Sequence, residues 1–241
     1  MDRIPDTAMV LAAGLGTRMR ALSDETPKPL IKVAGKALID YALDRFENAG
    51  VKRAVVNIHY LADQMEAHLA SRTAPEIIIS DERNMLLETG GGLKHARRHF
   101  GQAPIFCTNT DAIMLDEGEE ACAILAKAWN TAKMDALLLL APIEKTSGYD
   151  GKGDFDQAEN KRISFRTLKT APFVFTGLQI ISPALVDEGP EGAFSTKLLW
   201  DRAAERGRLY GALYSGFWMH VGDPDGLAFA ERRLTHDGSC P

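Results

Sequence analysis

Residues 10–19 read VLAAGLGTRM, so an apolar run continues directly into small residues and two glycines. A second segment, TPKPL at residues 26–30, follows closely and contains Lys28. Glycine lets a backbone approach a phosphate and turn its N–H groups toward it, and cations such as Arg18 and Lys28 pair with phosphate oxygens. The two segments therefore predict a buried strand whose carboxyl end opens into a phosphate-binding loop.

Three interpretations of this loop can be weighed on the residues alone. The first is a plain strand-to-helix turn with solvated cations. The second, a dinucleotide-binding fingerprint, needs a third glycine where Met19 stands, and an acidic residue about 20 positions further on, where residues 31–33 read IKV. The third, a Walker loop, needs Gly-Lys-Ser/Thr where residues 16–18 are Gly-Thr-Arg. The residues therefore disfavour the dinucleotide-binding fingerprint and the Walker loop, and they remain compatible with a plain turn.

The first two-thirds of the chain alternate between apolar runs of strand length and segments with helical spacing. The runs are residues 8–12, 54–58, 77–79, 104–108 and 136–141, and the helical segments are residues 38–46, 61–71, 93–100 and 119–131. Strands that are apolar throughout and alternate with helices indicate a parallel sheet covered on both faces. We therefore predict the α/β class: a Rossmann-like three-layer α/β/α fold with a mostly parallel central sheet, and ligands beyond the carboxyl ends of its strands.

The pattern changes after Pro142. Residues 147–156, SGYDGKGDFD, have the composition of a loop. Strands are expected at residues 162–165, 173–181, 209–213 and 217–221, and helices at residues 195–206 and 224–234. We interpret residues 1–241 as one domain, in which residues 1–142 carry the phosphate-binding loop. Residues 143–241 would form a small antiparallel, substrate-side part and a C-terminal helix.

The composition disfavours several classes of protein. With 28 Lys and Arg against 33 Asp and Glu, the formal net charge is −5, which argues against a nucleic-acid or anionic-membrane binder. Three cysteines without a Cys-x-x-Cys spacing argue against a disulfide framework or a structural zinc site. No apolar run approaches the ~20 residues of a membrane span, and no secretory pattern is visible. We expect a cytoplasmic monomer or homodimer that acts on small molecules.

The loop and the PKPL segment together resemble the opening of the sugar-1-phosphate nucleotidyltransferases. The resemblance continues at residues 88–93 (ETGGGL), 109–111 (NTD), 175–177 (FTG) and 218–224 (WMHVGDP). Members of this family couple a nucleoside triphosphate to a sugar 1-phosphate and release pyrophosphate. Within the family, the short chain, the Glu-Thr-Gly-Gly-Gly run and the Trp-x-x-Val-Gly-Asp-Pro ending look most like the subgroup that uridylylates N-acetylmuramate 1-phosphate for peptidoglycan recycling.

Other activities stay open beside this resemblance. Within the family they are thymidylyl or guanylyl transfer to glucose or mannose 1-phosphate, and cytidylyl transfer to phosphocholine. A nucleotide-sugar-binding regulatory subunit without catalysis is a rival from another class, although a mere binder has no need of the complete set of charged residues. A nicotinamide oxidoreductase is disfavoured by Met19. Pyrophosphate release across a matrix of triphosphates and sugar 1-phosphates separates these alternatives.

The resemblance also implies roles for individual residues. Arg18 would contact the β- and γ-phosphates, Lys28 would bind the α-phosphate, and both would serve catalysis together with Asp111. Asp111 and Asp223 would hold Mg²⁺. The nucleotide would lie on Leu11, Ala12, Ala13, Gly14, Leu15, Gly16, Thr17, Arg18, Lys28, Gly90, Gly91 and Asn109, with the glycines of residues 90–92 against the pyrimidine. Substrate would contact Asn109, Thr176, Gly177, Lys197 and Trp218.

Alternatives remain for some of these residues. Asp111 could be a helix cap or a solvated loop acid, Asp223 could cap the helix that begins at Pro224, and Trp218 could simply close the core. Many relatives carry a Glu-Lys-Pro segment whose lysine binds the sugar phosphate. This chain lacks it, and the possible substitutes are Lys161, Lys169 and Lys197. Candidates for a cation that binds the lactyl carboxylate of N-acetylmuramate are Lys169, Lys197 and Arg202.

Overall fold

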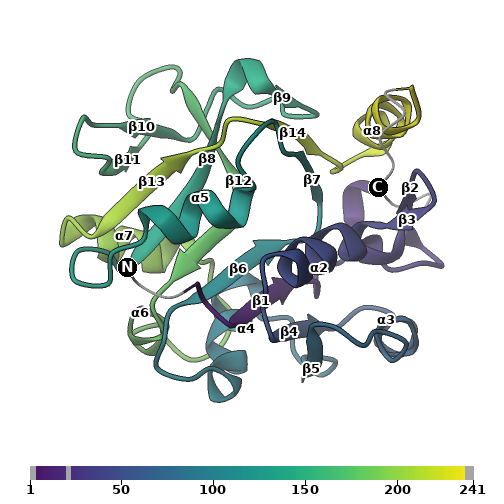
Figure 1. The fold of residues 1–241 in the computed structure, drawn as a ribbon. Helices are drawn as coiled ribbons and strands as arrows, with labels where there is room; N and C mark the ends of the chain where they lie inside the picture. The colour runs from purple at the N-terminus through teal and green to yellow at the C-terminus, as the bar shows by residue number, and fades with distance from the viewer. Residues whose placement is uncertain (1–3, 20–22, 237–241) are drawn as a thin grey trace.

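The computed structural model describes residues 4–19 and 23–236, and a nine-stranded sheet forms its centre (Figure 1). The strands are β1 (Thr7–Leu11), β4 (Arg53–Ile58), β5 (Glu76–Asp81), β6 (Ile105–Asn109), β8 (Ala136–Pro142), β10 (Phe155–Gln157), β11 (Ile163–Phe165), β12 (Phe173–Ile181) and β13 (Leu209–Leu213). β1 lies between β4 and β6 and is parallel to both, and β5 extends the sheet beside β4. Among the described strands of this sheet, only β11 and β12 run against the others, so the prediction of a mostly parallel sheet is confirmed.

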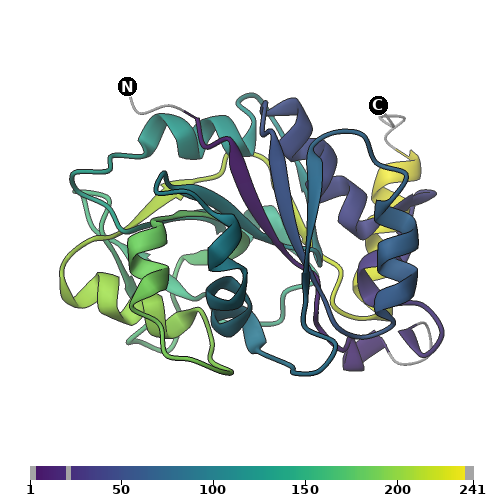
Figure 2. The same cartoon turned by 90° about the horizontal axis from the view of Figure 1, so that it is seen from below.

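Helices cover both faces of this sheet, and Figure 2 shows the sheet between them. One layer contains α2 (Leu38–Asn48), α3 (Ala62–Leu69) and α5 (Ala121–Ala128), and the other contains α4 (Glu88–Ala96), α6 (Pro183–Asp187) and α7 (Lys197–Glu205). Side chains alternate along β1, so Ala8 and Val10 are buried in the core of the first layer and Met9 in the core of the second. The predicted three-layer α/β/α fold is therefore confirmed.

A small sheet brings the C-terminal part of the chain back to the first loop. It contains β7 (Ala112–Leu115), β14 (Phe217–His220) and β9 (Thr146–Ser147), with β14 antiparallel to β7 and parallel to β9. The last helix, α8 (Pro224–His236), packs through Ala230 and Leu234 into a core that includes Met19, at the end of the first loop. Within the described residues, the structure contains no helix of sufficient length and apolarity to cross a membrane.

The structure differs from the predicted elements at α4 and in several short elements. The helix expected at residues 93–100 begins at Glu88, and after Ala96 it tightens into the 3₁₀ turn η3 (Arg97–His99). The ends of the loop expected at residues 147–156 lie in β9 and β10. The elements that were not predicted are the hairpin of β2 (Lys32–Val33) and β3 (Lys36–Ala37), the strand β7, the helix α6, and the 3₁₀ turns η1 (Thr17–Met19), η2 (Lys28–Leu30) and η4 (Ile143–Lys145). They are too short to show a sequence period.

Helix α4 runs through three glycines because its first turn packs against backbone. Glycine costs about 1 kcal/mol relative to alanine in a helix interior, so propensity alone predicts a later start. The N–H groups of Gly90 and Gly91 donate to the carbonyl of Phe194 at 2.8 and 3.0 Å, which holds the helix start against the segment before α7. A Cβ on Gly91 would collide with the carbonyl oxygen of Gly192. Tertiary packing therefore overrides propensity here.

Replacing Gly91 by alanine should destabilise the fold. The colliding atom belongs to backbone that is hydrogen-bonded nearby, so relief requires a backbone shift, which typically costs about 1–3 kcal/mol. We expect Gly91→Ala to lower the melting temperature by about 2–4 °C for each kcal/mol lost. Gly101→Ala is the matched control, because a Cβ there meets nothing within 4 Å. Equal melting temperatures for the two variants in thermal denaturation would refute this account of the glycine run.

Candidate functional site

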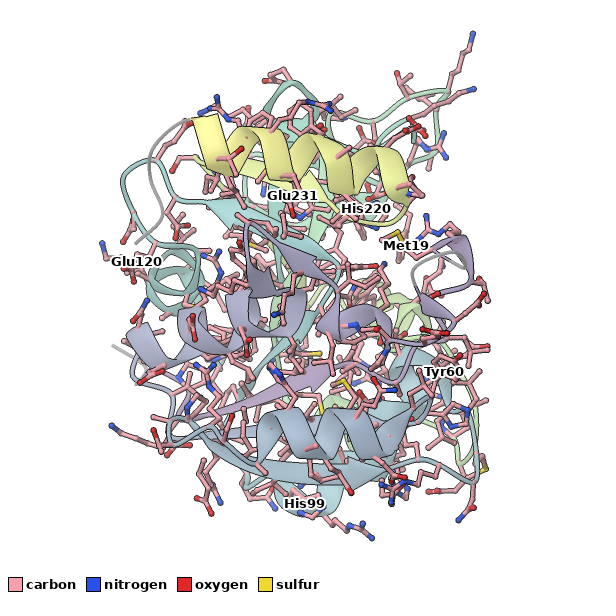
Figure 3. All side chains as sticks on the ribbon, turned by 90° about the vertical axis from the view of Figure 1, so that its right-hand side faces the viewer. Met19, Tyr60, His99, Glu120, His220 and Glu231 are labelled. Atoms are coloured by element: carbon pink, nitrogen blue, oxygen red, sulfur yellow. The ribbon has the colours of Figure 1, made fainter. Side chains whose placement is uncertain are left out.

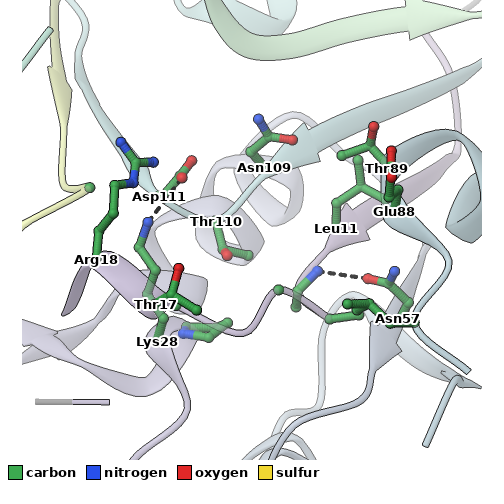
Figure 4. A pocket seen from close by; sticks show the side chains of 17 residues that line it. Leu11, Thr17, Arg18, Lys28, Asn57, Glu88, Thr89, Asn109, Thr110 and Asp111 are labelled. Carbon is green, nitrogen blue, oxygen red and sulfur yellow. Dashed lines mark hydrogen bonds and ion pairs between the residues drawn. The ribbon is translucent and has the colours of Figure 1, made fainter. Parts of the chain in front are cut away.

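A cavity of about 290 Å³ lies at the carboxyl ends of β1 and β6, the edge at which parallel α/β sheets bind ligands (Figure 4). Its walls come from the loop after β1, the turn η2, the start of α4 and the residues that follow β6. The lining residues are Leu11, Ala12, Ala13, Gly14, Gly16, Thr17, Arg18, Lys28, Pro29, Asn57, Leu86, Glu88, Thr89, Asn109, Thr110, Asp111 and Gly222. The cavity thus joins segments that lie far apart in the sequence.

Most residues predicted for the nucleotide site come together in this cavity. Those that line it are Leu11, Ala12, Ala13, Gly14, Gly16, Thr17, Arg18, Lys28, Asn109 and Asp111. Other predicted residues are absent from its lining, namely Leu15, Gly90, Gly91, Thr176, Gly177, Lys197, Trp218 and Asp223. Lys197 lines a second cavity instead.

The central contact of the cavity is an ion pair between Lys28 and Asp111. Lys28 Nζ lies 3.0 Å from Asp111 Oδ2, and the side chains are 11% and 28% exposed. Burial by itself would raise the pKa of Asp111, but the hydrogen bond from His220 and the charge of Lys28 outweigh it and hold that pKa well below its usual range. Figure 4 shows the guanidinium of Arg18 on the same side of the cavity as this pair. The site therefore places two cations beside one ionised carboxylate.

His220 is a site residue that the sequence did not single out. Its Nε2 lies 3.4 Å from Asp111 Oδ2, and its Nδ1 lies 3.1 Å from the carbonyl oxygen of Gly148. The ring stacks on Trp218 at a centroid distance of 5.8 Å. Figure 3 shows His220 beneath α8, on the same side of the molecule as Met19. Its place within the Trp-Met-His-Val-Gly-Asp-Pro segment was the available signal, but only the pairing of β14 with β7 brings it to Asp111.

A buried pair of side chains, Asn57 and Glu82, holds the start of the first loop. The N–H of Ala12 donates to Asn57 Oδ1 at 2.7 Å, and Asn57 Nδ2 donates to Glu82 Oε1 at 3.0 Å. Both side chains are almost completely buried, and burial raises the pKa of Glu82. His59 Nδ1 contacts the carbonyl oxygen of Glu82 at 2.7 Å, so this histidine supports the same backbone. The sequence offered no signal for the pair beyond two polar residues at strand ends.

The glycines of residues 90–92 face the protein itself. A Cβ on Gly90 would collide with the ring of Phe194, and a Cβ on Gly92 would lie 2.7 Å from Asn57 Nδ2 and 3.0 Å from Glu82 Oε1. Gly92 therefore leaves room for the pair that holds Ala12. From this part of the chain, Glu88 and Thr89 line the cavity. Contact between the glycines and a pyrimidine stays a prediction.

Thr176, Gly177 and Trp218 form a layer behind the cavity. Thr176 is fully buried and its Oγ1 donates to the carbonyl of Leu139 at 3.0 Å. Trp218 is 4% exposed, and its Nε1 donates to the carbonyl of Thr176 at 2.9 Å, which favours its role in closing the core. Gly177 has φ +91°, and a Cβ there would lie 3.3 Å from Asn109 Cβ. Of the three, Gly177 lies next to Asn109, and Thr176 and Trp218 are held in the core.

Asp223 caps α8. Its Oδ1 accepts a hydrogen bond from the N–H of Gly226 at 2.8 Å, the geometry of an N-terminal helix cap. Two residues earlier, the N–H of Val221 donates to the carbonyl of Asp111 at 2.8 Å, so Asp223 follows a segment that is tied to Asp111. The cap predicted as the alternative for Asp223 is present, and it leaves Oδ2 outside this hydrogen bond.

Known proteins resemble this chain over nearly its whole length. The family model of the MobA-like NTP transferase domain matches residues 8–142. The N-acetylmuramate alpha-1-phosphate uridylyltransferase of Caulobacter vibrioides is 46% identical over 97% of this chain and 99% of its own length. The protein of the same name from Neisseria meningitidis serogroup B is 32% identical over 89% of this chain and 92% of its own length.

A solved structure, that of the inositol-1-phosphate CTP transferase from T. maritima, shares the fold with a TM-score of 0.79 over 100% of both chains, at 15% identity. The fold, the family model and the two relatives agree with one another. The chain therefore belongs to the MobA-like NTP transferase family and, within it, to the sugar-1-phosphate nucleotidyltransferases.

Proposed function

We propose that this protein transfers a uridylyl group from UTP to N-acetylmuramate 1-phosphate. The observation that carries the proposal is the cavity in which the glycine loop, Arg18 and the Lys28–Asp111 pair meet at the carboxyl edge of the sheet. Two relatives that cover about nine-tenths or more of the chain are named for that reaction. The products are UDP-N-acetylmuramate and pyrophosphate.

The reaction consists of the attack of one phosphate on another. A phosphate oxygen of the sugar 1-phosphate forms a bond to the α-phosphorus of UTP, and the bond from that phosphorus to the bridging oxygen of the β-phosphate breaks. Mutual repulsion of the negative charges opposes the approach, so catalysis requires positioning and positive charge rather than a covalent enzyme intermediate. The cavity residues supply both.

The chain's own groups divide these tasks. Residues 11–14, 16 and 17 line the cavity beside Arg18, and the hydrogen bond from Ala12 to Asn57 holds the start of that loop. Lys28, held at 3.0 Å by Asp111, presents its ammonium group where charge builds up on the α-phosphate. Arg18, exposed at the cavity rim, would contact the outer phosphates, for which its planar guanidinium suits two-point contact.

Asp111 lines the cavity, and Asp223 directly follows Gly222, which also lines it, so the two carboxylates fit a hard divalent cation that takes its other ligands from substrate. No cluster of three or more His, Cys, Asp or Glu side chains suited to a metal occurs within residues 4–19 and 23–236. Mg²⁺ often binds one or two carboxylates and completes its coordination with phosphate oxygens and water. We propose that Asp111 and Asp223 hold Mg²⁺, which when bound would supply positive charge to the triphosphate.

The substrate assignment is tested by pyrophosphate release across a matrix of substrates. UTP, dTTP, CTP and GTP are each combined with the 1-phosphates of N-acetylmuramate, N-acetylglucosamine, glucose and mannose in the presence of Mg²⁺. We expect the highest kcat/KM for UTP with N-acetylmuramate 1-phosphate. A preference for another pair would change the assigned substrates but keep the reaction class. If no pair released pyrophosphate, the proposal would be overturned.

Asp111→Asn should reduce turnover far more than it affects folding. Asparagine keeps the shape of the side chain and an oxygen acceptor for Lys28, but it removes the charge that a hard cation requires. We expect kcat to fall by about 100-fold or more, as for the loss of one preorganised electrostatic contact, while unfolding stays cooperative. Asp63→Asn is the control, since that side chain on α3 is 97% exposed. Near-normal turnover by Asp111→Asn at ordinary Mg²⁺ would exclude the proposed metal site.

Two variants of Asp223 separate its charge from its helix cap. Asparagine caps helices about as well as aspartate, whereas alanine costs about 1 kcal/mol at such a position. If Asp223 shares a cation with Asp111, Asp223→Asn and Asp223→Ala should both lose activity, and only Asp223→Ala should also melt earlier. The double variant with Asp111→Asn should be barely worse than the poorer single variant. Full activity of Asp223→Asn would show that Asp223 is a cap and nothing more.

A further inference from the structure

A second cavity lies on the side of the molecule formed by residues 143–241. It measures about 400 Å³ and is lined by aromatic side chains, Phe165, Phe175 and Trp200 among them, with Arg166 and Lys197 beside them. The rings contact one another: Phe175 and Trp200 meet edge to face at a centroid distance of 4.9 Å. Half-buried aromatic rings flanked by a few polar groups are typical of a small-molecule site rather than of a solvated surface.

One hydrogen bond connects the two cavities at the start of α7. The N–H of Thr196 donates to Thr89 Oγ1 at 2.9 Å; Thr89 lines the first cavity, and Lys197, the next residue after Thr196, lines the second. The strand β12 makes a second connection. Phe175 lines the second cavity, and Gly177, two residues later, lies against Asn109 of the first. The start of α7 and the strand β12 therefore each connect residues of the first cavity with residues of the second.

Two cations, Lys197 and Arg166, line the second cavity. Lys197 Nζ lies over the ring of Phe165 at 4.0 Å from its centroid, and Arg166 is the next residue after Phe165. Lys197 also pairs with Asp201 at 2.7 Å, but an ammonium group has three donors and this carboxylate does not exhaust them. The guanidinium of Arg166 donates from Nη1 to the carbonyl of Lys169 at 3.1 Å, which engages one of its five donors.

One carboxylate, that of Asp154, also lines this cavity and accepts hydrogen bonds from neighbouring residues. Asp154 accepts a hydrogen bond from the hydroxyl of Tyr149 at 2.8 Å and another from the N–H of Phe175 at 3.0 Å. Each oxygen of Asp154 therefore accepts one hydrogen bond from inside the protein, while Arg166 and Lys197 supply the positive charge of the cavity. The cavity is suited to a small group with one apolar face and one carboxylate.

We infer that the cavity of Phe165, Arg166, Phe175, Lys197 and Trp200 binds the acidic substituent of the sugar. The inference rests on the proposed function, in which that substituent is a lactyl ether: its methyl group lies on the rings of Phe165 and Trp200, and its carboxylate accepts hydrogen bonds from Arg166 and Lys197. Of the cations considered from the sequence, Lys161, Lys169 and Arg202 are absent from the lining of this cavity. Arg202 donates instead to the carbonyl of Glu188.

The test compares two sugar 1-phosphates that differ only in this substituent. Arg166→Gln and Lys197→Gln are assayed with UTP and either N-acetylmuramate 1-phosphate or N-acetylglucosamine 1-phosphate. Each variant should lose about tenfold or more in kcat/KM for the acidic sugar, the scale of one hydrogen bond to a charged group. For the neutral sugar, kcat/KM should stay within a factor of two or so of wild type. Lys169→Gln and Arg202→Gln are matched controls that remove cations from the same part of the chain and should leave the ratio unchanged.

The possible outcomes separate this inference from the function it rests on. If wild type uridylylates N-acetylmuramate 1-phosphate but Arg166→Gln and Lys197→Gln leave the ratio of the two sugars unchanged, the proposed function stands and the subsite is wrong. Equal losses on both sugars would also overturn the subsite, because they indicate a general effect on the site. If wild type fails to use the acidic sugar at all, both proposals fall. Thermal melting of each variant shows that any loss is not one of folding.

Discussion

The hydrogen bond from the N–H of Ala12 to Asn57 determines where the chain leaves the sheet. β1 ends at Leu11, and the next N–H would be left unpaired at a buried position if a side chain did not accept it. Asn57 stands opposite Leu11 in the register of β1 and β4, and Glu82 keeps its amide in the one orientation that presents Oδ1 to Ala12. The hydrogen bond thus holds the start of the loop, and the residues that follow it line the cavity.

The position of Asn57 and Glu82 also restricts the helix α4, which packs against them. Gly92 of α4 lies so close to Asn57 and Glu82 that a side chain would displace them, and α4 is fixed in turn by the carbonyl of Phe194. The segment that ends at Phe194 leads into α7, whose first residue, Lys197, lines the second cavity. One chain of contacts thus connects the phosphate loop, the glycine run and the second cavity. These parts of the sequence lie more than 180 positions apart.

The charges of the site are assembled from both halves of the chain. Lys28 and Arg18 come from the N-terminal segments, whereas Asp111 follows β6 and His220 ends β14. His220 reaches Asp111 because β14 pairs with β7, the strand that begins directly after Asp111. The partners of that carboxylate are therefore brought together by strand pairing and not by proximity in sequence. The lowered pKa of Asp111 is therefore a property of the complete fold.

Features that are encoded in neighbouring residues could be predicted from the sequence. Contacts between segments that lie far apart in the chain could not. The glycine loop, Arg18 and Lys28 are encoded in nearby residues, so it could be predicted that they line one cavity, as could the three layers of the fold.

The glycine run of residues 90–92 shows what local sequence cannot predict. Glycine at residues 90–92 indicates close approach, but whether the neighbour is a base or the protein itself depends on where the segment 192–194 lies, more than 90 positions away. Trp218 shows the same limit, since an aromatic residue beside a site can stack on ligand or close the core. Its indole N–H donates to the carbonyl of Thr176, a bond that no spacing in the sequence encodes.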